Sequence, residues 1–141
     1  MKRSRIRPGL GNPIPEGQRA LVEKREAGRC LRCGGPGYEV HHRRSRRVLD
    51  AHTHCICNMV LLCRTCHVWA HVGSNRLARR RGWIVSQHEG TPDRIPVLAS
   101  GPWLMLPCVG LSRPLSDDQV VVRDTEPPEV SAALYRLLST A

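Results

Sequence analysis

The sequence predicts a small α+β fold made of short strands and short helices. At 141 residues, the chain has the length of one ordinary domain. Brief β-prone apolar runs alternate with stretches whose apolar residues recur at helical spacing. Aromatic residues make up only 4% of the chain and Phe is absent, so the large side chains that usually fill a core are scarce. Something besides apolar packing is therefore expected to hold the fold together.

The chain starts with a basic arm that is followed by a helix. Residues 1–15 mix Lys and Arg with Gly and Pro, a composition that resists regular structure, so we expect a flexible arm. The segment "EGQRALVEKREA" (16–27) contains good helix formers and stops at Gly28, a typical C′ residue. No stretch approaches the ~20 apolar residues of a membrane span. We expect a cytoplasmic protein without a membrane partner.

Two Cys-x-x-Cys pairs predict a structural metal site. Cys30 and Cys33 form the first pair, and the glycines directly after them permit the tight turn that lets two thiolates face one ion. Cys63 and Cys66 form the second pair. In the cytoplasm, clustered cysteines are more often metal ligands than disulfides, so we expect a structural Zn²⁺. The separation of the pairs, residues 34–62, exceeds that of a simple zinc ribbon, which indicates additional structure in this gap.

Two strands and a helix are expected in and after this gap. The short β-prone run "YEVHH" (38–42) predicts one strand, and "NMVLL" (58–62) predicts its partner. The segment "CRTCHVWAHV" has helical spacing and places His67 and His71 at i and i+4, on one helix face. Trp69 falls roughly opposite them and is expected to pack.

The histidines of this region suit a hydrolytic metal site. Such a site needs ligands that leave coordination positions open and a histidine that takes a proton from water near neutral pH. His41 and His42 are adjacent on a strand and point to opposite sides, so one can bind metal while the other faces a substrate. The segment "HTHCIC" (52–57) offers further metal ligands, but we expect it to be an idiosyncratic loop. Cys108 is expected to be a lone buried thiol.

The rest of the chain predicts a short basic helix and a β-rich extension. After residue 72, "GSNRLARRRGWIV" predicts a helix and then a strand from Trp83 to Val85. The later runs "IPVLAS", "WLMLP" and "QVVVR" predict short strands, and "PPEVSAALYRLLS" predicts a final helix. The expected organisation is a basic arm at 1–15, a core domain at 16–88 and a β-rich extension with a terminal helix at 89–141.

The positive charge is concentrated in the first part of the chain. Residues 1–88 contain 18 Lys/Arg and 5 Asp/Glu, whereas residues 89–141 contain 4 and 7. Basic clusters attract a phosphate backbone through counterion release, although one such cluster alone is more often a solvated face. Three clusters around one His/Cys region favour a nucleic-acid partner.

The segments "CLRCG", "EVHH" and "NMVLLCRTCH" occur in an order that resembles the HNH endonucleases, a branch of the His-Me finger or ββα-metal group, in the zinc-knuckle version common in bacteriophages. The resemblance is strongest over residues 16–85. It implies a ββα-metal, treble-clef-like core that holds the four-cysteine zinc. It also implies a phage-encoded protein in the host cytoplasm, with DNA and phage packaging proteins as partners.

The resemblance also implies roles for individual residues. His42 corresponds to the general base that activates water, and Asn58 to the residue that helps to orient this base. His41 and His67 correspond to ligands of the catalytic divalent ion, and His71 matches a further ligand found in some members only. Mg²⁺ or Mn²⁺ is the expected catalytic ion, with Ni²⁺ or Zn²⁺ also compatible with histidine ligands. The arginines expected to contact flanking phosphates are Arg43, Arg44, Arg46 and Arg47.

We therefore expect an endonuclease that nicks or cuts double-stranded DNA. The main alternative is a non-catalytic, zinc-dependent DNA-binding module whose His-His pair is structural. A third possibility, a toxin or restriction nuclease, shares the chemistry and differs in its partner. The sequence leaves open the preferred site, the number of strands cut, the oligomeric state and the role of residues 89–141.

Overall fold

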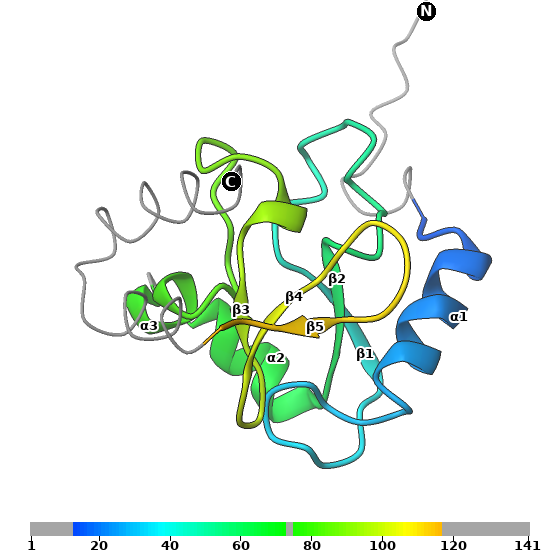
Figure 1. The fold of residues 1–141 in the computed structure, drawn as a ribbon, viewed down its shortest axis with the longest axis vertical. Coiled ribbons are helices and arrows are strands. Elements are labelled where there is room, and N and C mark those ends of the chain that lie inside the picture. The colour runs from blue at the N-terminus through cyan, green and yellow to red at the C-terminus, as the bar shows by residue number, and fades with distance from the viewer. Residues whose placement is uncertain (1–12, 73–74, 117–141) are drawn as a thin grey trace, which may run out of the picture.

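The computed structural model describes residues 13–72 and 75–116, which form a small mixed α+β fold (Figure 1). The predicted arm up to residue 12, the run "QVVVR" and the final helix lie outside the described residues. The elements in chain order are α1 (Glu16–Arg25), β1 (Glu39–His42), β2 (Met59–Leu62), α2 (Arg64–His71), α3 (Arg76–Arg80), the 3₁₀ turn η1 (Pro92–Arg94), β3 (Val97–Leu98), β4 (Trp103–Met105) and β5 (Arg113–Pro114).

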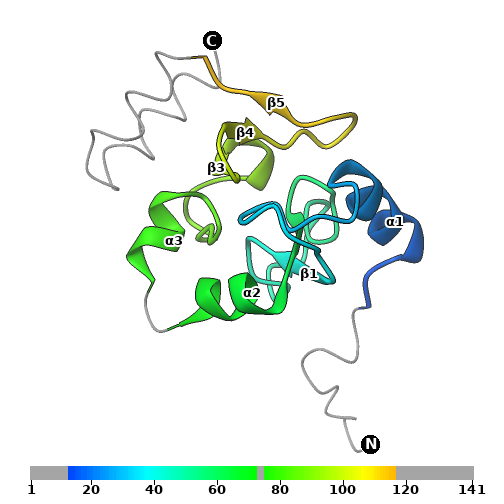
Figure 2. The ribbon, with the colours of Figure 1, turned by 90° about the horizontal axis from the view of Figure 1, so that it is seen from below.

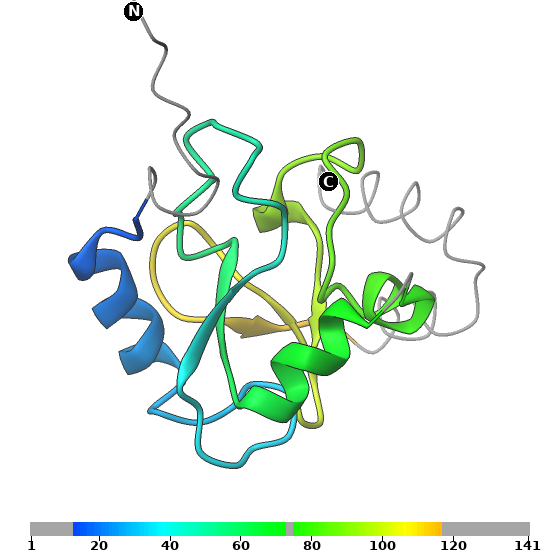
Figure 3. The same cartoon turned by 180° about the vertical axis from the view of Figure 1, so that it is seen from behind.

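The centre of the fold is the predicted strand pair. β1 and β2 are antiparallel, with Glu39 opposite Leu62 and His42 opposite Met59. All four residues of β2 are buried because both faces of this strand are covered. Met59 and Leu61 pack with Val22 of α1, and the alternate residues of β2 pack with Cys66 of α2. Accordingly, α1 and α2 lie on opposite sides of the strand pair (Figures 1 and 3).

Helix α1 forms as predicted but ends at Arg25, two residues before the end of the predicted segment 16–27. The N–H of Ala27 donates to the Lys24 carbonyl at 3.1 Å and the N–H of Gly28 donates to the Glu23 carbonyl at 3.0 Å, the two bonds of a Schellman motif. The C′ residue is therefore Ala27, with φ of 53°, and Gly28 follows it with φ of 69°. Gly28, one position past C′, still favours this helix end. The turn holds two successive residues in the left-handed region, which glycine adopts without steric cost.

The predicted strand from Trp83 to Val85 does not form. The N–H groups of Trp83 and Ile84 both donate to the carbonyl of Ala78, so this segment turns back on α3. Only Val85 pairs in a strand-like way, through a parallel bridge to Arg44. Gly82 permits the turn with φ of +78°, and a Cβ at this position would lie 1.8 Å from the carbonyl oxygen of Pro96. At Gly82 the backbone thus crosses closely over the backbone at Pro96. This crossing prevents an extended strand from starting here.

The first part of the predicted β-rich extension is present as the sheet β3-β4-β5. Figure 2 shows this sheet at the end of the molecule away from α2. Val97 and Leu106 nevertheless belong to the same buried cluster as Val60 and Leu62 of β2. Val97 and Leu106 therefore complete the core around β2, while Trp103, Met105 and Leu115 form a separate small cluster with Leu98. None of the helices in the described segments combines the length and the apolar character needed to cross a membrane.

Candidate functional site

The two Cys-x-x-Cys pairs meet at one point beside the strand pair. The sulfur atoms of Cys30, Cys33, Cys63 and Cys66 all lie within 4.8 Å of one another. The Sγ atoms of Cys33 and Cys63 are 3.8 Å apart. Tetrahedral Zn²⁺ with bonds of about 2.3 Å to sulfur requires an S···S separation of ~3.8 Å. The four cysteines thus fit a structural Zn²⁺, as the sequence predicts.

The surroundings of this cluster prepare it for a cation. Burial alone would raise the pKa of Cys30, but backbone hydrogen bonds at Cys33, Cys63 and Arg32 lower it to about 7. Burial raises the pKa of Cys66 to about 12, even though Arg32 donates to its sulfur at 3.4 Å. A bound metal ion deprotonates such a thiol outright. The same guanidinium lies 3.6 Å from the ring centre of Trp69, which fixes Arg32 against the helix.

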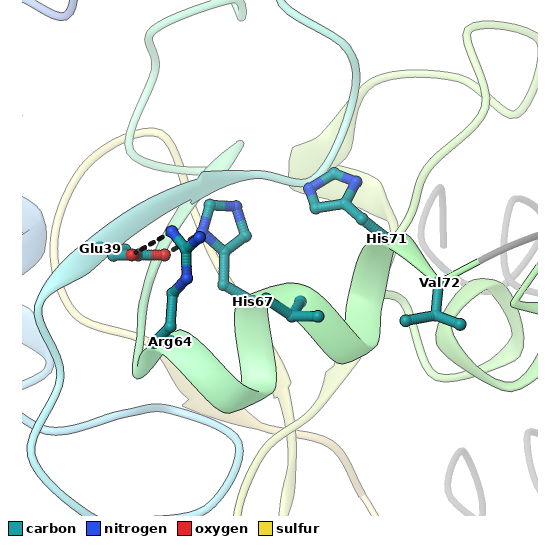
Figure 4. Close-up of a pocket in the computed structure, with 6 residues that line it drawn as sticks. Glu39, Arg64, His67, His71 and Val72 are labelled. Carbon is teal, nitrogen blue, oxygen red and sulfur yellow. Dashed lines mark hydrogen bonds and ion pairs between the residues drawn. The ribbon is translucent and has the colours of Figure 1, made fainter.

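Three of the predicted site histidines come together on the other side of α2. The ligand nitrogens of His41, His67 and His71 all lie within 4.8 Å of one another. The ring of His41 is 5.2 Å from that of His67 and 5.0 Å from that of His71, measured between ring centres. The i, i+4 spacing puts His67 and His71 on one face of α2, and Figure 4 shows both rings projecting from that face. β1 crosses this face and contributes His41.

The ring of His41 has one engaged and one free nitrogen. Its Nε2 lies 2.7 Å from the carbonyl oxygen of Trp83 and therefore donates to it. This fixes a lone pair on Nδ1, which is buried and has no hydrogen-bond partner among the described residues. Burial also lowers the pKa of His41 to about 3, so the ring is neutral. A buried, neutral, unpartnered acceptor beside two other histidines fits a metal ligand.

Glu39 supports this cluster and was not among the predicted site residues. Its Oε2 lies 2.6 Å from Nδ1 of His67, and its Oε1 accepts a hydrogen bond from Arg64 at 3.0 Å (Figure 4). The contacts with His67 and Arg64 lower the pKa of Glu39. Nε2 of His67 remains for an ion, in the carboxylate–histidine arrangement that orients metal ligands. The available signal was the spacing, since Glu39 precedes His41 by two residues on the same strand face.

The cluster opens to solvent through a shallow pocket. Its volume is about 300 Å³. The pocket exposes His67 and His71 of α2 to solvent. The residues that line it are Glu39, Arg64, His67, Val68, His71 and Val72.

His42 lies apart from the three-histidine cluster and contacts a different histidine. Its Nε2 is 3.1 Å from Nδ1 of His54, and the two rings meet edge to face. Burial lowers the pKa of His42 to about 4, with additional contributions from the charges of Arg46 and His54. His41 and His42 thus have different surroundings, as expected for adjacent residues on a strand. His54 was expected only as part of a variable loop.

Asn58 holds the loop that separates these two histidines. Its side chain is fully buried, and its Oδ1 accepts a hydrogen bond from the N–H of Arg44 at 2.7 Å. Its Nδ2 donates to the carbonyls of Arg44 and Thr53 at 3.1 and 3.0 Å. Arg44 follows His42 by two residues and Thr53 directly precedes His54. The amide thus fixes the backbone beside both rings, and these three bonds all go to backbone atoms.

Two of the four arginines expected on phosphates are buried. Arg43 is 1% exposed because its guanidinium donates to backbone carbonyls of residues 57, 82, 92 and 95. Arg44 is 4% exposed and forms an ion pair of 2.5 Å with Asp50. The expectation that these two contact DNA is therefore corrected, since their charges are used within the fold. Arg46 is half-buried and Arg47 is exposed, so both keep access to a partner.

The structure also corrects the expectation for Cys108. This residue is exposed and not isolated, because its sulfur lies 3.7 Å from Nδ1 of His52. Together with Cys55 and Cys57 these residues form a third cluster of potential metal ligands. Sequence spacing did not reveal it, since Cys108 comes from the segment after β4.

No protein-family model matches the chain, and no match was found among curated proteins or solved structures. The chemistry of the site therefore follows from its own residues.

Proposed function

We propose that this protein is a metal-dependent HNH-type endonuclease that hydrolyses phosphodiester bonds of DNA. The observation that carries the proposal is the convergence of His41, His67 and His71, in which the Nδ1 of His41 is buried without a partner among the described residues. These residues lie on an antiparallel strand pair followed by a helix, the element order of a ββα-metal core. The predicted base, His42, is the residue after His41 on the same strand.

The donor set of the three-histidine cluster determines which ions fit. Three imidazoles leave coordination positions open, as a catalytic site requires. Imidazole nitrogens favour Zn²⁺ or Ni²⁺, whereas Mg²⁺ and Mn²⁺ prefer oxygen donors, which water and phosphate would supply. When bound, such an ion supplies Lewis-acid stabilisation of the negative charge that develops on the phosphate.

His42 is suited to accept the proton of the attacking water. Burial disfavours the charged imidazolium and lowers the pKa of His42, so the ring is neutral, which is the form that can accept a proton. In this role the Nε2–H of His42 donates to Nδ1 of His54, and Nδ1 of His42 then carries the lone pair that accepts the proton from water. Proton transfer to Nδ1 generates the hydroxide that attacks phosphorus, and the bond between phosphorus and the 3′-oxygen breaks. His54 acts here as a positioning residue, since it holds the ring without touching the substrate.

DNA would be held by the exposed arginines around the pocket. Arg64 lies at the pocket rim and is 80% exposed in its side chain. Helix α3 is the next element after α2 in the chain, and its Arg76 and Arg79 are exposed. Arg47 adds a cation on the loop after β1. Contacts of this kind position the phosphate backbone without reading sequence, so we propose cleavage with little sequence preference.

Cleavage of supercoiled plasmid tests the proposal. Purified protein is assayed without metal and with Mg²⁺, Mn²⁺, Ni²⁺ or Zn²⁺, beside His42→Ala and the matched control His88→Ala, which changes an exposed histidine outside the site. We expect metal-dependent relaxation or linearisation, unchanged in the control and reduced about 10²–10⁴-fold in His42→Ala, the usual contribution of a general base. DNA affinity and zinc content should stay the same in both variants.

Two results would contradict the proposal. If no metal supports cleavage while zinc content and DNA binding are intact, the protein is a zinc-dependent DNA-binding module. If His42→Ala loses zinc and DNA affinity together with activity, the histidine is structural.

A further inference from the structure

The third cluster, made of three cysteines and one histidine, lies outside the proposed active site and is separate from the four-cysteine cluster. His52, Cys55 and Cys57 come from the loop between β1 and β2, and Cys108 comes from the segment after β4. Their four ligand atoms all lie within 4.8 Å of one another, the same limit that the four-cysteine cluster meets. The fold thus gathers three sulfur atoms and one imidazole nitrogen from two segments 56 positions apart.

The distances within this cluster fit the edges of a zinc tetrahedron. Nδ1 of His52 lies 3.5 Å from the sulfur of Cys57 and 3.7 Å from that of Cys108. Zn²⁺ bonds of about 2.3 Å to sulfur and 2.0–2.1 Å to nitrogen require an S···N separation of ~3.6 Å. Both observed distances therefore agree with ligands that share one ion, as the 3.8 Å separation of Cys33 and Cys63 does in the predicted site.

The loop that carries three of these ligands is held in place by its own hydrogen bonds. The N–H of His52 donates to the carboxylate of Asp50 at 2.8 Å, and the Thr53 hydroxyl donates to the carbonyl of Val48 at 2.6 Å. The N–H of Asn58 donates to the carbonyl of Cys55 at 2.9 Å. Such ordering reduces the conformational entropy that ion binding would otherwise cost.

The chemistry of the four donors selects the ion. Thiolates are soft ligands, and a set of three sulfurs and one imidazole is one of the usual structural zinc sets. Closed four-coordinate sets of this kind leave no position for a substrate, so the site is structural. None of the seven cysteines forms a disulfide. Four of them belong to the four-cysteine cluster, and the other three belong to the cluster with His52.

We propose that His52, Cys55, Cys57 and Cys108 bind a second structural Zn²⁺. This ion joins the segment after β4 to the loop that carries His54, the partner of His42. It thereby gives the described part of the extension a role, as a cross-link that restrains the loop next to the base. The zinc site stands whether or not the protein cleaves DNA.

Zinc counting by native mass spectrometry tests this assignment. All samples carry His67→Ala and His71→Ala, which removes any ion at the three-histidine cluster from the count. We expect two zinc ions per chain in this background and one after the further changes Cys55→Ser and Cys108→Ser. The matched control adds His88→Ala instead and should retain two ions. A count of one ion in the background protein would overturn the proposal.

Alkylation of the unmodified protein gives a second measurement that needs no variant. Under reducing conditions, Cys55, Cys57 and Cys108 should resist iodoacetamide until a zinc chelator is added, although Cys108 is exposed. Alkylation of Cys108 at the rate of a free thiol before chelation would overturn the proposal. So would a disulfide between two of these three cysteines in protein purified without reductant.

Discussion

Glu39 shows how a single side chain can set the behaviour of the proposed active site. Its carboxylate contacts the Nδ1 of His67 at 2.6 Å and accepts from Arg64 on its other oxygen. The first contact fixes the ring so that Nε2 faces His41 and His71, and the negative charge makes the ring a stronger ligand. At the scale of the residue, we therefore expect metal affinity to depend on a group that is not itself one of the three candidate ligands.

Glu39→Gln should weaken metal binding without removing a ligand. The amide keeps the size of the side chain and loses the charge that supports His67. We expect the metal concentration for half-maximal cleavage to rise about 10–100-fold, the usual effect of changing such a partner. Calorimetric titration with Mn²⁺ or Ni²⁺ would report the same shift without relying on activity. The control Glu23→Gln changes an exposed carboxylate of α1. Equal affinities in both variants would show that Glu39 has no such role.

Two contacts of the site could not be predicted from sequence spacing, for a physical reason. His41, His67 and His71 could be predicted because strand alternation and the i, i+4 rule are local. The contact of Glu39 with His67 joins positions 28 apart, and that of His54 with His42 depends on the path of a loop. A loop path is determined by its tertiary hydrogen bonds, which spacing alone does not encode.

At the scale of elements, the loop between β1 and β2 depends on the amide of Asn58. The strands on either side are predicted by their apolar runs, whereas the loop contains few apolar residues to anchor it. Asn58 replaces such an anchor, with two bonds to the backbone of Arg44 and one to the carbonyl of Thr53. Both of its polar atoms are engaged, and the side chain is fully buried. The loop is thereby ordered on the side that faces His42.

Asn58→Ala should destabilise the protein more than a comparable change at a helix end. It leaves a buried N–H and buried carbonyls without partners, so we expect a loss of about 2–4 kcal/mol in the free energy of unfolding. Asn75 makes a useful comparison, because its side chain accepts from the N–H of Ala78 as the N-cap of α3. Asn75→Ala should cost about 1 kcal/mol. Denaturant unfolding of zinc-loaded protein measures both, and equal losses would contradict the role of Asn58.

The secondary structure also shows that local sequence patterns predict some elements and miss others that depend on tertiary contacts. The strand pair and α2 were predicted because each has a clear apolar or helical pattern. The strand at Trp83 failed because the carbonyl of Ala78 captures two N–H groups that a strand would need for a partner. The β-prone residues of this segment contribute to the core and not to a strand, since Trp83 is 1% exposed and packs in the main core.

At the scale of the whole molecule, Arg43 connects the site to the extension. Its guanidinium donates to the carbonyl of Cys57 at 3.0 Å, of Gly82 at 2.8 Å and of Pro92 at 3.1 Å. These carbonyls belong to three segments that make few regular backbone pairs with one another. A buried cation therefore replaces the ladder hydrogen bonds that a larger sheet would supply. Charge counting along the sequence cannot distinguish such an arginine from one that binds DNA.

Arg43→Ala and Arg47→Ala should separate these two uses of arginine. Arg43→Ala leaves several buried carbonyls unpaired, and we expect a loss of about 3 kcal/mol or more in the free energy of unfolding. Arg47→Ala should leave stability within about 0.5 kcal/mol of wild type, as surface changes usually do. It should lower DNA affinity and reduce the slope of affinity against salt by about one unit. A stable Arg43→Ala protein with weakened DNA binding would instead restore the phosphate-binding role.

Metal removal tests how the whole fold is held together. The structure has few large core side chains, and its central cluster includes Cys30 and Cys66 of the predicted zinc site. Structural zinc contributes about 10–16 kcal/mol in small domains, which matches or exceeds the ~5–15 kcal/mol net stability of a typical protein. A strong chelator with reductant should therefore unfold the chain cooperatively, as seen by circular dichroism, and zinc should restore it. The three-histidine cluster is open to solvent on one side, so brief treatment with a weaker chelator should abolish cleavage while the fold persists. Apoprotein that keeps its native spectrum with all cysteines reactive would mean that apolar packing alone supports the structure.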